Sequence, residues 1–344
     1  MFLIVTRNFP PELGGIQSLM GGLSENLLNH GPVKVFTYEF PNSDLYDNKS
    51  SIKIERIKGI KIFRKFRKAN LVNDFINANP NIRALIADHW KSLELIKTEN
   101  LKKIKTFCLL HSKEINHELG SSTNRRIIKS TNNANFLISN SNYTKELAIK
   151  IGLDSSKIKI IFPGIEKPVN LDNLDIIKAE KFFGDSFPKI ITVSRLDKRK
   201  GHDKILMLIK NLKPKFPKIK YVSVGFGKEE SNLLQLRKEL GLENEVSFVK
   251  NIDYNFKASL IAKSNLFLMP SRIEKKSVEG FGISFLEAAS YGVASIGGKD
   301  GGASDAIVDK KTGLICDGND LNSIYKSVIN FFSNDNYLNY GKNA

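Results

Sequence analysis

The sequence contains few of the residues on which small secreted or membrane-spanning proteins depend. Its two cysteines, Cys108 and Cys316, stand far apart among apolar neighbours, which favours a reduced environment over a disulfide framework. The hydrophobic runs are far shorter than a membrane span, and Arg7 follows the first one too closely for a secretory signal. No metal-binding cluster is visible. We therefore expect a cytoplasmic protein that is soluble or peripheral on the inner face of the membrane.

Acidic residues are also scarce relative to basic ones. The chain has 53 Lys plus Arg against 36 Asp plus Glu, a net charge of +17 that favours nucleotides, nucleic acid or acidic lipid as partners without choosing among them. The densest basic run extends from Lys53 to Lys68 and is interleaved with isoleucine and phenylalanine. It indicates either a surface that lies on anionic lipid or a solvated face whose apolar half is in the core.

The length and the pattern of apolar runs predict two domains. A chain of 344 residues with 41% hydrophobic content suits two middle-sized cores. Short apolar strands alternate with helical segments, which is typical of a parallel sheet with crossover helices. A polar stretch around Pro168 is the expected linker. We expect an α/β fold with two Rossmann-like domains, residues 1–167 and residues 168–344.

One stretch, residues 279–292, gives the most direct indication of a binding site. It reads as a glycine-rich loop that follows the apolar strand 266–269 and opens a helix. Its glycines allow close backbone approach to a ligand, and the free amides near Phe281, Gly282 and Ile283 suit a phosphate. Glu287, one turn into the helix, suits a neutral polyol, and Glu279 lies before the turn. The stretch predicts a nucleotide-sugar site; two solvated glutamates on an amphipathic helix are the alternative.

Three further loops follow predicted strands. Gly14 and Gly15 open a helix after strand 2–6, and Gly225 ends the strand that begins at Tyr221. The first loop lacks the dinucleotide-binding spacing and has a tight structural turn as its alternative, and the second is a weak signal by itself. His111 stands at the carboxyl end of strand 106–110, the edge where open α/β sheets bind ligands.

Two cations are placed to act on phosphate. Arg195 ends a strand that begins at Lys189, and Lys200 precedes the next helix. Beside a diphosphate they would stabilise the charge that grows on the leaving group. A solvated basic turn is the alternative, and we leave Lys198 and Arg199 outside the prediction.

These motifs, in this order, resemble the family-4 retaining glycosyltransferases. The resemblance covers the whole chain and is strongest over residues 190–314. The opening around Gly14 and Gly15 is similar to that of bacterial lipid-directed mannosyltransferases of the family, such as the phosphatidylinositol type. The resemblance implies the GT-B fold, in which two Rossmann-like domains face each other across a cleft. The first domain would bind the acceptor and the second the nucleotide sugar.

The resemblance also implies a mechanism and its residues. The reaction would be retaining sugar transfer in which the donor's own phosphate receives the acceptor proton, with no cofactor and no metal, because cations and helix amides supply the positive field. The implied catalytic residues are Arg195, Lys200, Glu279 and His111. The implied donor-binding residues are Gly14, Gly15, Gly225, Phe281, Gly282, Ile283 and Glu287.

The donor and acceptor remain open at this point. GDP-mannose is the favoured donor, followed by UDP-glucose or UDP-N-acetylglucosamine, and the acceptor would be a hydroxyl of a lipid, a lipid-linked sugar or an oligosaccharide. An anionic membrane surface is an expected partner, whereas nucleic acid is not, because the cations are spread along the chain without an aromatic-basic RNA motif.

The sequence also departs from the family pattern. Ser112 and Lys250 stand where the family commonly has glycine, and the chain stops before a helix that usually returns to the first domain. The remaining alternative is therefore an inactive, C-terminally truncated protein that binds nucleotide or nucleic acid.

Overall fold

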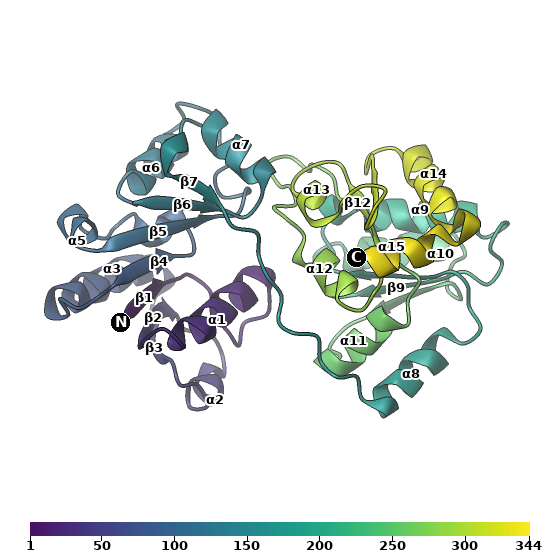
Figure 1. Ribbon diagram of the computed structural model, residues 1–344, viewed down its shortest axis with the longest axis horizontal. Helices are drawn as coiled ribbons and strands as arrows, with labels where there is room; N and C mark the ends of the chain where they lie inside the picture. The colour runs from purple at the N-terminus through teal and green to yellow at the C-terminus, as the bar shows by residue number, and fades with distance from the viewer. The chain divides into compact units, whose positions relative to one another are not determined.

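The computed structural model describes residues 1–344, apart from the side chain of Asn334. The chain divides into two units, Met1–Gly164 and Ile165–Ala344, close to the boundary expected after residue 167 (Figure 1). Each unit has its own parallel sheet with helices on both faces. The two α/β units expected from the sequence are thus both present.

The first unit is built on a seven-stranded sheet in the order β3-β2-β1-β4-β5-β6-β7. Its strands are β1 (Phe2–Val5), β2 (Val33–Tyr38), β3 (Lys53–Ile57), β4 (Ala84–Ala87), β5 (Lys105–Leu110), β6 (Phe136–Ser139) and β7 (Ile158–Ile160). Its helices are α1 (Gly15–Leu28), α2 (Ser43–Asp47), α3 (Lys61–Ala78), α4 (Trp90–Leu93), α5 (Thr98–Lys102), α6 (Ser122–Thr131), α7 (Asn142–Lys150) and the 3₁₀ helix η1 (Ser155–Lys157). Helices α3 to α7 cover one face of the sheet, and α1 and α2 cover the other.

The second unit is built on a six-stranded sheet in the order β10-β9-β8-β11-β12-β13. Its strands are β8 (Lys189–Val193), β9 (Lys220–Val224), β10 (Val246–Val249), β11 (Leu266–Met269), β12 (Ser295–Gly298) and β13 (Gly313–Cys316). Its helices are α8 (Asn173–Phe183), η2 (Lys198–Lys200), α9 (His202–Leu212), α10 (Glu230–Glu239), α11 (Tyr254–Ala262), α12 (Ile283–Ala289), α13 (Ala303–Ala306), α14 (Leu321–Phe332), η3 (Ser333–Asp335) and α15 (Asn336–Asn343).

The apolar strands owe their composition to burial on both faces. In β11, Leu266 and Leu268 pack on the side of α9 and α14, whereas Phe267 and Met269 pack on the side of α8, α11 and α12. Strands covered on both faces carry continuous apolar runs rather than alternating ones. This is why the strand signal is strong in the sequence although polar residues do not alternate with apolar ones.

The strand order reverses between β1 and β4 in the first sheet and between β8 and β11 in the second. Loops on either side of such a reversal diverge, and they leave a crevice at the carboxyl edge of the sheet where open α/β folds bind ligands. Arg7 and Asp88 follow β1 and β4, and Arg195 and Pro270 follow β8 and β11. The topology therefore points to one candidate position in each unit.

The basic run of residues 53–68 does not form one continuous element. Its first part is β3, and its second part is the amino-terminal half of α3. Ile62, Phe63 and Phe66 of α3 are exposed beside basic neighbours, so this part keeps both its apolar and its basic character at the surface. Among the described residues, no helix combines the length and the apolar character needed to cross a membrane.

Candidate active site

A buried ion cluster joins the two loops at the strand reversal of the second unit. The Oε2 atom of Glu279, from the loop after β11, accepts hydrogen bonds from Arg199 Nη1 at 2.7 Å and from Lys200 Nζ. All three side chains are almost fully buried. Burial alone would raise the pKa of Glu279, but Lys200 and Arg199 outweigh it and bring the pKa to about 2. The carboxylate is therefore ionised.

Glu279 keeps one oxygen available. Both cations contact Oε2, and Oε1 takes no hydrogen bond from the described residues. A carboxylate that is fixed through one oxygen can accept hydroxyl groups with the other. The geometry thus suits recognition of a polyol at a defined position.

A second ion pair fixes the turn that carries Arg199 and Lys200. Arg272 holds Asp203 through two parallel hydrogen bonds of 2.9 Å, and its backbone N–H donates to the carbonyl of Arg199. Such bidentate pairs restrict both distance and orientation. The sequence prediction left Arg199 out, because nothing in four closely spaced cations tells which of them turns inward.

Arg195 lies on the outer side of the same loop, in front of a buried polar network. Its side chain is exposed, with Nη2 at 3.5 Å from Asp197 Oδ2. Behind it, His202 Nε2 is 3.0 Å from Ser194 Oγ, and His202 Nδ1 is 3.0 Å from the hydroxyl of Tyr221. Because the Tyr221 hydroxyl donates to Thr192, its oxygen can accept a hydrogen bond from His202 Nδ1.

The glycines of the predicted donor loop allow close backbone packing. Gly282 caps α12 with φ +93°, and a side chain there would meet the ring of Phe285. Phe281 is buried, and Gly302 donates its N–H to the carbonyl of Glu279 at 2.9 Å. Ile283 begins α12 as expected. The loop is therefore fixed by the close packing of Gly282 on Phe285 and by the hydrogen bond from Gly302 to Glu279.

Glu287 lies one turn into α12 and is partly exposed. Lys257 Nζ from α11 contacts its Oε1 at 3.3 Å, and the same ammonium lies over the ring of Tyr254. The sequence prediction missed Lys257, since it belongs to a helix that carries no motif. Gly225 directly follows β9 with φ +143°, and a Cβ atom there would lie 2.1 Å from the carbonyl oxygen of Ser194.

The first unit holds the other predicted residues. His111 follows β5, and its Nε2 donates to the carbonyl of Asp88 at 3.0 Å. Asp88 was missed from the sequence; its carboxylate accepts hydrogen bonds from the Arg7 N–H and from Ser92 Oγ. Ser112, where glycine is common in the family, adopts φ +80°, and its hydroxyl contacts Thr144.

Gly14 caps α1 with φ +155°, and Gly15 is the first helical residue. The loop before them is anchored by Arg56, which donates to the Pro10 carbonyl and to Asp47 at 2.7 Å. The structure thus brings together Arg195, Lys200, Glu279 and the donor loop in the second unit. His111, Gly14 and Gly15 belong to the first.

No group of three or more His, Cys, Asp and Glu side chains that could hold a metal ion occurs among the described residues.

Comparison with known proteins relates this geometry to a reaction. Residues 174–344 match the family model described as glycosyl transferases group 1. The chain is a glycosyltransferase, and its second unit is a group 1 domain.

Relatives of this glycosyltransferase extend over both units. A GDP-mannose-dependent α-(1-6)-phosphatidylinositol monomannoside mannosyltransferase of Mycolicibacterium smegmatis is 25% identical over 95% of this chain and 87% of its own length. The gpi3 subunit of the phosphatidylinositol N-acetylglucosaminyltransferase of Schizosaccharomyces pombe is 26% identical over 57% of this chain and 41% of its own.

Solved structures show the same fold. HepE of Anabaena, crystallised with UDP-glucose, covers 100% of this chain and 93% of its own with a TM-score of 0.81 and 18% identity. A sucrose-phosphate synthase of Thermosynechococcus elongatus has the same coverage with a TM-score of 0.79 and 18% identity. The fold of this glycosyltransferase is therefore that of the GT-B enzymes, as the sequence predicts.

Gly225→Ala tests the close approach of β9 to the loop that carries Arg195. The added Cβ would overlap the Ser194 carbonyl, so we expect a loss of about 1–3 kcal/mol in the free energy of unfolding beyond that of a control. Gly241→Ala is the control, because Gly241 also has a positive φ, +64°, but no atom within 4 Å of the added Cβ. Denaturant unfolding measures the difference, and equal losses would contradict the packing argument.

His202 predicts a specific pH dependence of stability. Burial, followed by the charge of Lys200, lowers the pKa of His202 from 6.5 to about 4. The unfolded chain therefore binds the proton first, and this contribution is complete above pH 6.5 and is lost as the pH falls through 4. We expect the free energy of unfolding to drop over this range by about 3 kcal/mol more in the wild type than in His202→Gln. His30→Gln, at an exposed position, should retain the wild-type slope.

Proposed function

We propose that this glycosyltransferase transfers mannose from GDP-mannose, with retention of configuration, to a hydroxyl group of a lipid acceptor. The observation that supports the reaction is the buried contact of Lys200 with Glu279, with Arg195 nearby, at the strand reversal of the second unit. The similarity to a GDP-mannose-dependent enzyme over nearly the whole chain supports the choice of donor and of a lipid acceptor. Lipid-linked sugars and oligosaccharides carry the same acceptor group and remain within the proposal.

The proposed roles follow from the contacts of each residue. The amides of Phe281, Gly282 and Ile283 receive the diphosphate, with Gly225 leaving room for the nucleotide. Glu287 binds the ribose, and Oε1 of Glu279 accepts hydroxyls of the transferred sugar. In the first unit, Gly14 and Gly15 bring backbone amides to the donor, and His111 contacts the sugar near the acceptor.

The proposed step balances without an additional base. The acceptor oxygen forms a bond to the anomeric carbon as the bond from that carbon to the phosphate oxygen breaks, and the acceptor proton moves to the leaving phosphate on the same face. Arg195 and Lys200 stabilise the charge of the leaving nucleotide, a task that metal ions perform in other transferases. We therefore propose that magnesium is not required.

Nucleotide titration tests the donor site. We expect GDP to bind more tightly than UDP, without magnesium, and we expect Glu287→Ala to weaken binding by about tenfold or more because a hydrogen bond to a charged group contributes about 1.5–3 kcal/mol. Glu180→Ala is the matched control, since Glu180 is also paired with a lysine in this unit. Calorimetry with and without EDTA measures both effects. Tighter binding of UDP would replace the donor by UDP-glucose or UDP-N-acetylglucosamine, and no binding would contradict the proposal.

We further propose that the amino-terminal half of α3 places the protein on the inner face of an anionic membrane. Ile62, Phe63 and Phe66 are 71%, 56% and 48% exposed, and Lys61 and Arg67 stand beside them. Apolar side chains that insert at a lipid surface, together with basic ones that remain at the headgroups, are the features of a peripheral membrane helix.

Vesicle sedimentation tests this surface. The double variant Phe63→Ser with Phe66→Ser should reduce partition onto anionic vesicles by at least about tenfold, because each buried phenylalanine contributes about 1.5–3 kcal/mol. Leu174→Ser, at an exposed apolar position of the second unit, is the control. Wild-type binding should also fall with salt. Unchanged partition of the double variant would exclude α3 as the contact.

A further inference from the structure

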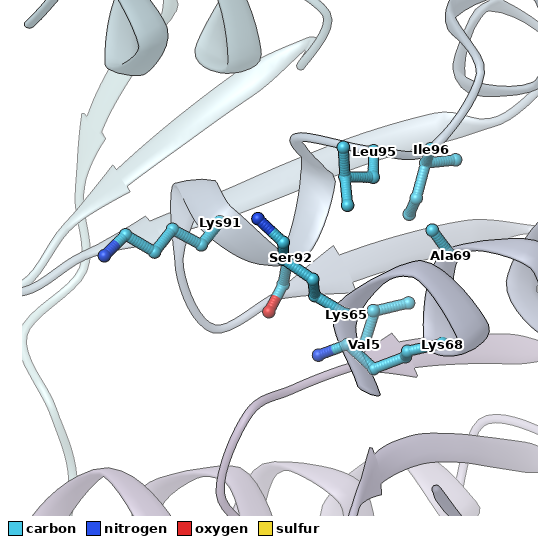
Figure 2. Close-up of a pocket in the computed structure, with 8 residues that line it drawn as sticks. All are labelled: Val5, Lys65, Lys68, Ala69, Lys91, Ser92, Leu95 and Ile96. Carbon is cyan, nitrogen blue, oxygen red and sulfur yellow. The ribbon is translucent and has the colours of Figure 1, made fainter. Parts of the chain in front are cut away.

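The first unit contains a second cluster of cations that the proposed donor site does not use. Lys65 and Lys68 of α3 and Lys91 and Ser92 of α4 line a small cavity of about 10 Å³, shown in Figure 2. We call these four residues the lysine pocket. The cavity lies next to Val5, the last residue of β1, and α4 follows the loop after β4. The lysine pocket is therefore at the strand reversal of the first sheet, where open α/β sheets bind ligands.

One of the three ammonium groups is held inside the protein. Lys68 is only 3% exposed; its Nζ donates to the Thr6 carbonyl at 2.7 Å and lies 4.4 Å from the centre of the Tyr38 ring. These contacts fix the position of Nζ without neutralising its charge. Burying an ammonium with one carbonyl and one aromatic partner is costly unless an anion is also available.

The surrounding charge is mostly of the same sign. Lys65 and Lys91 are exposed, and neither forms an ion pair with any described side chain. Two acids lie nearby: Asp88, whose carboxylate already accepts hydrogen bonds from the Arg7 N–H and from Ser92, and Glu94, which is paired with Arg126. Burial, and after it the charges of Arg7, Arg126 and Lys65, lower the pKa of Lys91, although Glu94 opposes them. Burial and Arg7 lower the pKa of Lys68 to about 8, although Asp88 opposes them.

We propose that the lysine pocket binds a phosphate group of the acceptor. The cavity accommodates one oxygen atom, the size of a single water, and Lys65 and Lys91 can close on the remaining phosphate oxygens at its mouth. This inference rests on the proposed function, since it names the part of the acceptor that the first unit recognises.

Two observations favour an acceptor over the donor diphosphate. The lysine pocket belongs to the first unit, whereas the cations assigned to the donor belong to the second. Within the first unit, Ser92 bonds to Asp88, and the Asp88 carbonyl accepts from His111, so the lysine pocket and His111 are connected through one residue. A phosphate held there would orient the hydroxyl-bearing part of the acceptor beside His111.

The position on α3 also favours a phosphate ester of a lipid. Lys65 lies one turn of α3 from Ile62 and Ala69, between the exposed apolar side chains and the cavity. A phosphate in the lysine pocket would therefore be adjacent to the surface proposed to contact the membrane. The shared chemistry is the phosphate group, which a soluble phosphate ester also offers.

Binding measurements on the whole chain test the lysine pocket without requiring turnover. Calorimetry uses inorganic phosphate and glycerol 1-phosphate as soluble probes, and a flotation assay uses neutral phosphatidylcholine vesicles that contain phosphatidylinositol. We expect Lys65→Gln and Lys91→Gln each to weaken binding by about tenfold, because each removes a charge-assisted contact. Lys129→Gln is the matched control: it removes the same charge from an exposed position of α6 in the first unit, outside α3 and the lysine pocket, and should bind like the wild type.

The two kinds of probe distinguish the source of the phosphate. A loss confined to the vesicle assay supports a lipid headgroup, and a loss with glycerol 1-phosphate as well supports a soluble ester. If Lys65→Gln and Lys91→Gln bind every probe like the wild type, or if Lys129→Gln loses as much as they do, the inference is wrong. Thermal unfolding confirms that each variant is folded.

The outcome is separable from that of the proposed function. These titrations contain no nucleotide, so a chain that fails to bind GDP still reports on the lysine pocket. Conversely, a chain that binds GDP and transfers mannose while Lys65→Gln leaves the KM for phosphatidylinositol unchanged would retain the proposed function and lose only this inference.

Discussion

The second unit depends on one carboxylate oxygen. Oε2 of Glu279 is shared by Lys200 and Arg199, and this sharing ties the loop after β11 to the loop after β8. Removing Glu279 would leave two buried cations without a counter-charge, which is far more costly than the net stability of an intact ion pair. The cluster therefore restricts where both loops can lie, and the positions of Arg195 and of the glycine loop follow from it.

The two units share a reversal of strand order, but the charged side chains around that reversal differ. Both sheets reverse strand order beside their first strand, and both gather cations at the carboxyl edge. In the second unit the single carboxylate of Glu279 is shared by two buried cations, which leaves one positive charge in excess. In the first unit Asp88 is occupied by backbone and hydroxyl donors and Glu94 is paired with Arg126, so neither acid forms an ion pair with Lys65, Lys68 or Lys91 among the described residues. A net charge of +17 thus separates into paired and unpaired cations that composition alone cannot distinguish.

Sequence patterns predicted the strands and the order of motifs well, because buried parallel strands carry continuous apolar runs that are visible locally. β11 is an example, with four fully buried residues between Asn265 and Pro270. Gly297 and Gly298 gave no strand signal, yet they end β12. A Cβ atom at Gly298 would lie 1.8 Å from the Ser271 carbonyl oxygen, so a tertiary contact overrides local propensity there.

Side-chain partners were less predictable than elements, since they depend on which way a turn faces. Lys198, Arg199 and Lys200 are consecutive, but the 3₁₀ turn they form sends Arg199 and Lys200 inward to Glu279, which is 79 residues away from Lys200 in the chain. The sequence prediction named Lys200 from the family resemblance and left Arg199 out. The same limit applies to Ser112: its departure from glycine is compatible with φ +80° because Thr144 holds its hydroxyl, a contact across 32 residues. Local sequence therefore indicates where a ligand binds, whereas the charge state and orientation of the binding groups arise from contacts that are distant in the chain.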